Sequence, residues 1–205
     1  MEPLHLLYLD EALIVVCKPA GLLAVPGRGE AGADNLSTRL QALHADVRVV
    51  HRLDMATSGL MVFARAAAVQ RALSMAFEAR RVHKQYVAVV EGVISGDAGQ
   101  IDAPLAADWP NRPRQQVDAA KGKPSLTLWR VLQRAADTTR LALTPVTGRT
   151  HQLRVHLQHI GHAICGDALY APPPHADRLL LHATQLAFEH PLTGRALSFD
   201  SPAPF

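Results

Sequence analysis

Runs of apolar residues predict most of the strands in this 205-residue chain. Residues 4–9 and 13–16 are short apolar runs separated by Asp10 and Glu11, a pattern that predicts a β-hairpin. Residues 86–93 are apolar on both faces, which is typical of a strand in the centre of a sheet. Further strands are predicted at 60–64, 126–132, 140–143, 179–188 and 197–199.

Three segments have helical spacing instead. The first begins at Asp34, the expected N-cap, and ends near residue 44. The second covers residues 66–79, and the third opens at 147–150 and stops before Gly161. Strands joined mainly by hairpins, with three helices between them, predict an α+β fold on a largely antiparallel, mixed sheet. The apolar stripes of the first and third helices are Leu36, Leu40, Leu43 and Leu153, Leu157, Ile160.

Length and composition favour one soluble globular domain spanning residues 1–205. The chain is 48% hydrophobic and 19% charged, and it is short for two ordinary cores. It has no apolar run near the roughly 20 residues that span a bilayer, and no secretory signal pattern. Cys17 and Cys165 form no Cys-x-x-Cys pair, which argues against a disulfide framework or a thiolate zinc site. We expect a cytoplasmic protein, and nothing requires more than a monomer.

The net charge is only +3, but basic residues cluster. Residues 108–124 contain three prolines and few apolar residues, so they predict an exposed loop or loose ribbon. Local basic tracts of this kind suit contact with a phosphate backbone, although a solvated surface would look the same. The basic residues of this segment are Arg112, Arg114, Lys121 and Lys123.

The polar loop at residues 51–58 carries the most distinctive carboxylate. Asp54 lies between two apolar strands, with Arg52 two residues before it and a Thr57-Ser58-Gly59 turn after it. Such an aspartate could be catalytic, or it could simply cap the turn by accepting a backbone N–H. The loop alone does not separate these interpretations.

Several segments, in order along the chain, resemble the motifs of the RluA family of pseudouridine synthases. Residues 51–60, His-Arg-Leu-Asp-Met-Ala-Thr-Ser-Gly-Leu, resemble that family's catalytic motif. The resemblance covers nearly the whole chain, and it implies a pseudouridine synthase fold with RNA-binding loops beside the sheet. The other matching segments are Lys-Pro-Ala-Gly at 18–21, Lys-Gln-Tyr-Val-Ala at 84–88, Gly-Arg-Thr-His-Gln-Leu-Arg-Val-His-Leu at 148–157 with 160–162 and 166–167, and Leu-His-Ala at 181–183.

The resemblance implies a role for each of five residues. Asp54 falls on the invariant catalytic aspartate, and Arg154 on the arginine that pairs with it. Tyr86 takes the place of the tyrosine beneath the target base, and Leu181 that of a leucine lining the uracil pocket. Arg52 would fill the gap left by the flipped base or hold a phosphate. Each has a structural alternative: core packing for Tyr86 and Leu181, and a surface salt bridge for Arg154.

The implied reaction breaks the C1′–N1 bond of a uridine, turns the uracil and rejoins it through C5. It transfers no electron, so we expect no cofactor and no metal. The base must leave the stack first, and an ionised carboxylate can then act as nucleophile or base. Whether Asp54 attacks the sugar, attacks the ring or removes a sugar proton stays open. The four histidines of the third helical region, His151, His156, His159 and His162, fan over too wide an arc to hold one ion.

Residues 108–113 and 122–124 resemble the RNA-gripping loop of the family's dual-specificity members. These act on 23S rRNA and on the tRNA anticodon loop, which we expect as partners here. Only 17 residues precede Lys18, too few for an S4-like RNA-binding domain. The four basic residues of the loop are predicted to contact phosphates, and Trp109 to stack on RNA or, the interpretation slightly favoured, to anchor the loop. The alternatives are a relative specific for one of the two RNAs and an inactive RNA-binding module.

Overall fold

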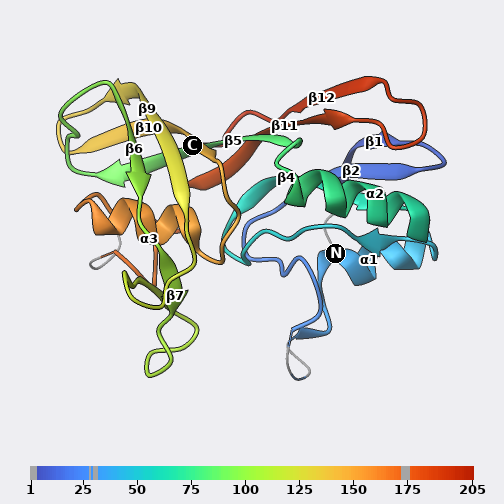
Figure 1. Ribbon diagram of the computed structural model, residues 1–205, viewed down its shortest axis with the longest axis horizontal. Helices are drawn as coiled ribbons and strands as arrows, with labels where there is room; N and C mark the ends of the chain where they lie inside the picture. The colour runs from blue at the N-terminus through green and yellow to red at the C-terminus, as the bar shows by residue number, and fades with distance from the viewer. Residues whose placement is uncertain (1–3, 28, 30–31, 172–175) are drawn as a thin grey trace. The chain divides into compact units, whose positions relative to one another are not determined.

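The computed structural model describes residues 4–27, 29, 32–171 and 176–205 (Figure 1). Most of its strand pairs are antiparallel, and three helices occur among the described residues, which confirms the predicted α+β class. The elements are β1 (His5–Leu9), β2 (Leu13–Lys18), α1 (Leu36–Leu43), β3 (Arg48–Val49), β4 (Ser58–Ala64), α2 (Ala67–Glu78), β5 (His83–Glu91), β6 (Ala98–Asp102), β7 (Leu105–Ala107), β8 (Gln115–Val117), β9 (Leu126–Arg134), β10 (Thr138–Pro145), α3 (Gln152–His159), β11 (Leu181–Glu189) and β12 (Ala196–Asp200).

The chain forms two compact units. Unit 1 comprises residues 1–84 and 183–204, and unit 2 comprises residues 85–182 with Phe205. Strands β5 and β11 each contain residues of both units. None of the helices in the described ranges is long and apolar enough to cross a membrane.

Unit 1 is built on β1, β2, β4, β11 and β12, with β3 paired to β4. Strands β2 and β4 are buried along almost their whole length, because apolar side chains occupy both of their faces. On one face, Val69 and Leu73 of α2 pack with Leu13, Val15 and Val62 in a common core. This core fixes the start of β4, where the loop with the candidate aspartate ends.

The N-cap of α1 differs from the prediction. Asn35, not Asp34, caps the helix, and its side-chain oxygen accepts the Thr38 backbone N–H at 2.9 Å. Asp34 instead pairs with Arg39 through two contacts of 2.6 and 2.7 Å. Aspartate and asparagine are equally suited to cap a helix. Here Asp34 pairs with Arg39 instead, which leaves Asn35 as the N-cap.

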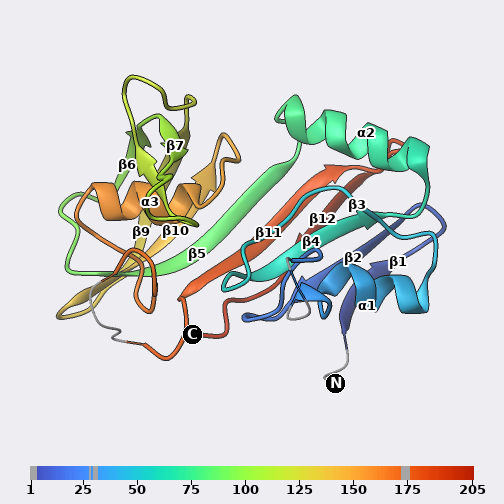
Figure 2. The ribbon, with the colours of Figure 1, turned by 90° about the horizontal axis from the view of Figure 1, so that it is seen from below.

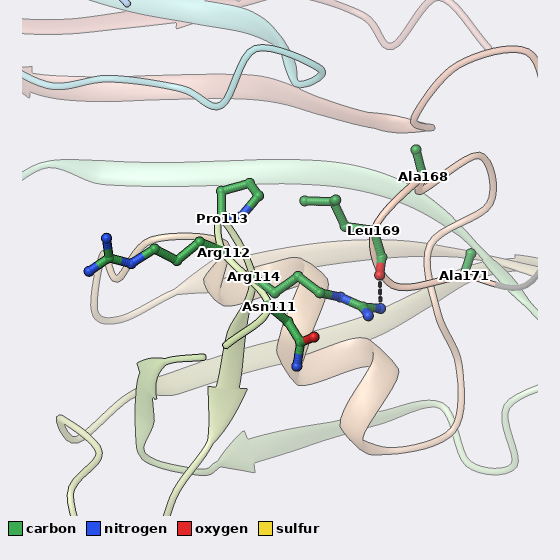
Figure 3. A pocket seen from close by; sticks show the side chains of 7 residues that line it. All are labelled: Asn111, Arg112, Pro113, Arg114, Ala168, Leu169 and Ala171. Atoms are coloured by element: carbon green, nitrogen blue, oxygen red, sulfur yellow. Dashed lines mark hydrogen bonds between the residues drawn. The ribbon is translucent and has the colours of Figure 1, made fainter. Parts of the chain in front are cut away.

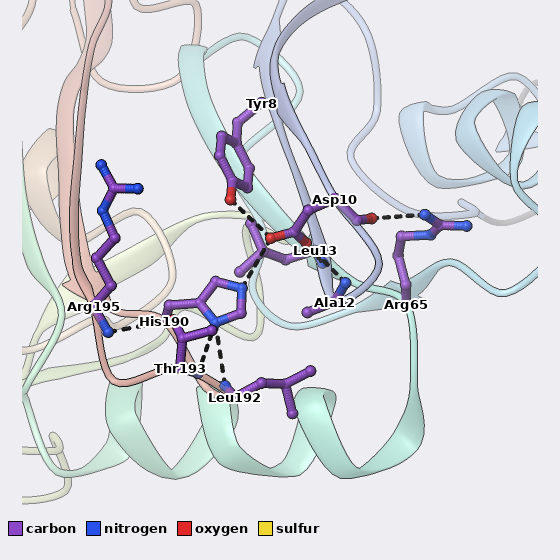
Figure 4. A network of polar contacts seen from close by, with 9 residues as sticks. All are labelled: Tyr8, Asp10, Ala12, Leu13, Arg65, His190, Leu192, Thr193 and Arg195. Carbon is purple, nitrogen blue, oxygen red and sulfur yellow. Dashed lines mark hydrogen bonds and ion pairs between the residues drawn. The ribbon is translucent and has the colours of Figure 1, made fainter.

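A polar network joins the two hairpin turns of unit 1 (Figure 4). Asp10 accepts from the Tyr8 hydroxyl at 2.8 Å and from Nε2 of His190 at 2.9 Å. Its Oδ1 accepts the backbone N–H groups of Ala12 and Leu13. Burial raises the pKa of Asp10, but the hydrogen bonds together outweigh it and leave the pKa below its ordinary value.

Unit 2 contains β5, β10, β9 and β6 in that order, and α3 packs beside β8, β9 and β10 (Figures 1 and 2). Strands β7 and β8 pair separately, so the segment 108–124, predicted as an exposed loop or loose ribbon, contains one strand of a hairpin. The sequence pattern also missed β6, whose strand is largely exposed. Helix α3 ends at His159, so Ile160 lies outside it and is 36% exposed, contrary to the predicted stripe.

Candidate active site

The loop that carries Asp54 lies in unit 1, between β3 and β4. Leu53 is buried, Arg52 is exposed and Asp54 is partly buried. The Thr57 N–H donates to the main-chain carbonyl of Asp54 at 3.1 Å, so the main chain itself closes the turn. The carboxylate is thus held on a tight turn between a buried leucine and a buried strand.

A fully buried lysine clamps this loop from β2. Nζ of Lys18 donates to the carbonyl oxygens of Pro19, Leu22 and Met55 at 2.7–3.0 Å. The Met55 carbonyl also accepts the Gly21 N–H at 2.9 Å. From the sequence, this Lys-Pro-Ala-Gly segment was predicted to be a turn and to match a family motif, with no link to Asp54. Its place in the fold shows that it holds the residue next to Asp54.

His51 supports the same loop from the other side. Its Nε2 accepts the Val62 N–H at 3.0 Å, and its ring stacks on Phe77 with the centroids 4.5 Å apart. Burial of the ring, together with the nearby Lys84 ammonium, lowers the pKa of His51 to about 3. The imidazole is therefore neutral at physiological pH, which its acceptor role requires.

Replacing His51 with glutamine should reduce the acid sensitivity of folding. In the unfolded chain a histidine binds a proton below about pH 6.5, whereas folded His51 stays neutral until about pH 3. Protonation therefore favours unfolding, and stability falls as the pH drops from 6.5 towards 3, by up to about 1.4 kcal/mol per pH unit.

Urea denaturation between pH 7 and pH 4.5 measures this slope. His51→Gln keeps an acceptor for Val62 but cannot titrate, so its slope should be shallower than that of wild type. The matched control is His5→Gln, at an exposed histidine of β1, and it should keep the wild-type slope. Parallel slopes for wild type and His51→Gln would contradict the expectation.

Arg154 lies on α3 in unit 2 and is only 5% exposed. Its Nε and Nη2 each donate to a different carboxylate oxygen of Asp167 at 2.7 Å. The alternative of an ordinary surface salt bridge is therefore wrong for this arginine, since the pair is buried and bidentate. Asp167 is a second residue whose role sequence reasoning missed, although it had been quoted within a matching segment.

The other residues assigned from the resemblance take these positions. Tyr86 lies on β5, opposite Leu143 of β10, and is partly buried. Leu181 begins β11 and is 3% exposed. Unit 1 thus carries Arg52 and Asp54, and unit 2 carries Tyr86, Arg154 and Leu181.

Four basic residues of unit 2 flank β8: two lie in the β7–β8 loop, and two follow β8. Arg112, Arg114, Lys121 and Lys123 are all exposed. Trp109 is 67% exposed, contrary to the favoured interpretation that it anchors the loop, and the Arg112 guanidinium lies 3.3 Å from the centroid of its ring. This places a cation and an aromatic face together at the loop tip.

A hollow of about 440 Å³ lies between residues 111–114 of this loop and the turn at residues 168–170 (Figure 3). Arg114 crosses it and donates to the Leu169 carbonyl oxygen. Asn111, Arg112 and Pro113 line it on one side, and Ala168 and Ala171 on the other. Its lining is therefore basic on the side of the hairpin.

Three of the histidines near α3, namely His151, His156 and His162, make hydrogen bonds. His156 is fully buried, and its two ring nitrogens lie 2.9 Å from the Thr127 hydroxyl and the Ala103 carbonyl oxygen. His162 pairs through Nδ1 with the Glu91 carbonyl oxygen at 2.8 Å. No group of three potential metal ligands occurs among the described residues.

The chain is similar to known proteins in sequence and in fold. The sequence pattern of the RNA pseudouridylate synthase family matches residues 12–159. The chain is 49% identical over 209 residues to the dual-specificity RNA pseudouridine synthase RluA of Escherichia coli strain K12, covering 100% of this chain and 95% of the relative. The protein of the same name from Vibrio cholerae is 49% identical over 191 residues, covering 92% and 78%.

A solved structure gives the same fold. The human RNA pseudouridylate synthase domain containing 1 matches with a TM-score of 0.83 and 28% identity, over 100% of this chain and 87% of that one. Family pattern, full-length relatives and fold all point to one conclusion. The chain belongs to the RluA family of RNA pseudouridine synthases, which are isomerases.

Proposed function

We propose that this synthase has dual specificity, isomerising one uridine in 23S rRNA and one in the tRNA anticodon stem-loop. The observation that carries the proposal is the 49% identity, over the full length of this chain, to a relative named for dual specificity. Residues 1–205 act as one catalytic domain in this proposal. Both cysteines are free thiols, which suits a monomer working in a reducing cytoplasm.

The proposed reaction needs only groups of the protein and the RNA. The target uridine leaves the stack, the C1′–N1 bond breaks, and the uracil turns so that C5 bonds to C1′. The proton on C5 is then lost to solvent, and N1 gains one. Atoms and electrons balance within the uridine, so no cofactor or metal is required.

Each assigned side chain has a physical task in this scheme. Asp54 is the essential carboxylate, and Arg154 is its proposed arginine partner in the reaction. Tyr86 holds the flipped uracil by stacking, worth about 1–3 kcal/mol. Leu181 excludes water so that the detached uracil is recaptured, and exposed Arg52 enters the gap in the RNA or holds a phosphate.

The β7–β8 hairpin and the residues just after it would bind RNA mainly through the phosphate backbone of the RNA. Replacing Arg112, Arg114, Lys121 and Lys123 together with alanine should weaken RNA binding and flatten its salt dependence, because fewer counterions are released. The slope of log Kobs against log salt concentration is negative, and it should become less steep by up to about 3. Filter binding of an anticodon stem-loop from 50 to 300 mM salt measures it.

The matched control removes the same charge elsewhere. Arg48, Arg71, Arg130 and Arg195 are also exposed, and their fourfold alanine variant should keep a slope near that of wild type. Equal slopes for the hairpin variant and wild type would show that these four residues do not contact phosphates.

Tritium release from C5-tritiated uridine tests the proposed specificity. The wild-type protein should release tritium from an anticodon stem-loop and from the matching 23S rRNA fragment. Release from one RNA alone would replace dual with single specificity. Tight binding with no release from either RNA would favour an inactive binding module or a different target uridine, and total cellular RNA would then be the substrate.

A further inference from the structure

Tyr170 lies in the turn at residues 168–170, between α3 and β11, and packs between α3 and the β7–β8 hairpin. Its side chain is 7% exposed and shares a small core with Leu105 of β7 and Val155 of α3. Val117 of β8 and Leu169 pack against the same core. One ring therefore touches both the β7–β8 hairpin and the helix of Arg154.

On the hairpin side, the Tyr170 hydroxyl accepts the Gln115 backbone N–H at 2.8 Å. Gln115 is the first residue of β8, immediately after Arg114. The Arg114 guanidinium lies 5.5 Å from the Tyr170 ring centroid and donates to the carbonyl oxygen of neighbouring Leu169. The turn thus holds the hairpin where its loop joins β8, by main-chain and side-chain contacts together.

On the helix side, the same hydroxyl lies 2.7 Å from Nδ1 of His151, the N-cap residue of α3. A hydroxyl that accepts from an amide can donate to this nitrogen, so both capacities of the oxygen are used. The Arg154 guanidinium lies 5.1 Å from the ring centroid. Asp167, which holds Arg154, also accepts the Tyr170 N–H at 3.2 Å.

We propose that Tyr170 is a positioning residue that fixes Arg154 relative to the RNA-binding hairpin. RNA gripped by the hairpin is then presented at a set distance from the arginine, and the hydroxyl that joins Gln115 to His151 sets that distance. This inference rests on the proposed roles of Arg154 in the reaction and of the β7–β8 hairpin in RNA binding. Tyr170 touches neither uracil nor sugar in this account, and it acts through Arg154.

Tyr170→Phe is the decisive variant, because it keeps the buried ring and removes only the hydroxyl. Its single-turnover rate constant for tritium release, at saturating enzyme, should fall about tenfold, since small misplacements of catalytic groups are costly. The Kd for the RNA should change less than twofold, because the phosphate contacts remain. Saturating enzyme makes the rate constant independent of the folded fraction.

Tyr8→Phe is the matched control, since it also deletes a tyrosine hydroxyl bonded to a folded partner, in unit 1. Its rate constant should equal that of wild type. His151→Asn removes the other end of the link, with a residue that tolerates the positive φ of 54° at this position. Combined with Tyr170→Phe it should slow the reaction little further.

The outcomes separate this inference from the proposed function. A slowed Tyr170→Phe, a normal Tyr8→Phe and non-additive His151→Asn would support the positioning role. An unchanged rate in Tyr170→Phe, or an equal loss in Tyr8→Phe, would overturn it while wild-type activity leaves the synthase assignment standing. Wild-type protein inactive on both RNAs would overturn the proposed function, and the inference with it.

Discussion

Replacing Asp54 with asparagine is expected to abolish tritium release, lowering kcat by about 10⁴-fold or more, as loss of an essential catalytic group does in other enzymes. Asparagine has the same shape but cannot act as a nucleophile or accept a proton as a carboxylate does. The turn should survive, because the Thr57 N–H bonds the main-chain carbonyl of residue 54. Lys18 holds the neighbouring Met55 carbonyl in either protein.

Three measurements make this result interpretable. RNA binding and the denaturation midpoint of Asp54→Asn should stay close to those of wild type. Asp46→Asn, which removes an exposed carboxylate paired with Arg65 in the same unit, should keep full activity. Substantial tritium release by Asp54→Asn would remove this aspartate from the chemistry and leave it the role of a turn residue.

Gly59→Ala should cost about 4 kcal/mol of unfolding free energy, near the upper end for single substitutions. Gly59 has a φ of 116°, where a side chain is strained. A Cβ there would also lie 2.3 Å from the Ala183 carbonyl oxygen and 2.5 Å from its nitrogen. Both obstacles are main-chain atoms of β11, so they can yield only if the strands of unit 1 separate.

Gly194→Ala measures the cost of a positive φ without the steric clash that a Cβ would make at Gly59. Gly194 also has a positive φ, 69°, in unit 1, but a Cβ there meets nothing within 4 Å. Its alanine variant should lose only about 1 kcal/mol. Urea denaturation of the two variants should therefore differ by about 3 kcal/mol, and equal losses would mean that β4 and β11 do not pack this closely in solution.

The elements that sequence patterning predicted are those whose signals are local. The β1–β2 hairpin, α2 and β9–β10 follow from apolar runs and spacing within a single segment. Strands β7 and β8 are three residues each, and Gln115 and Gln116 resemble loop residues. The pairing of these two strands is supported by packing of Leu105 and Val117 against Val155 and Tyr170, which lie far along the chain. The cap of α1 was misplaced by one residue because Asp34 and Asn35 carry equivalent signals.

The candidate site shows the same division. Asp54 stood out as a carboxylate in a polar loop, but its role came from a resemblance, since a turn cap has the same local sequence. The burial of Arg154 could not be read from its helix, because it depends on Asp167, 13 residues further along the chain. Complete burial of Lys18 was equally hidden, since only the folded chain brings the Met55 carbonyl within reach.

The Lys18 clamp also bears on affinity. A loop that orders only when its ligand arrives subtracts the lost conformational freedom from the binding free energy, at about 1–2 kcal/mol per residue. Here the carbonyl beside Asp54 is already held by Nζ of Lys18 and the Gly21 N–H without RNA. The loop loses this conformational freedom when the protein folds, so RNA binding does not have to order it. RNA contacts with this loop can therefore contribute their full free energy to affinity.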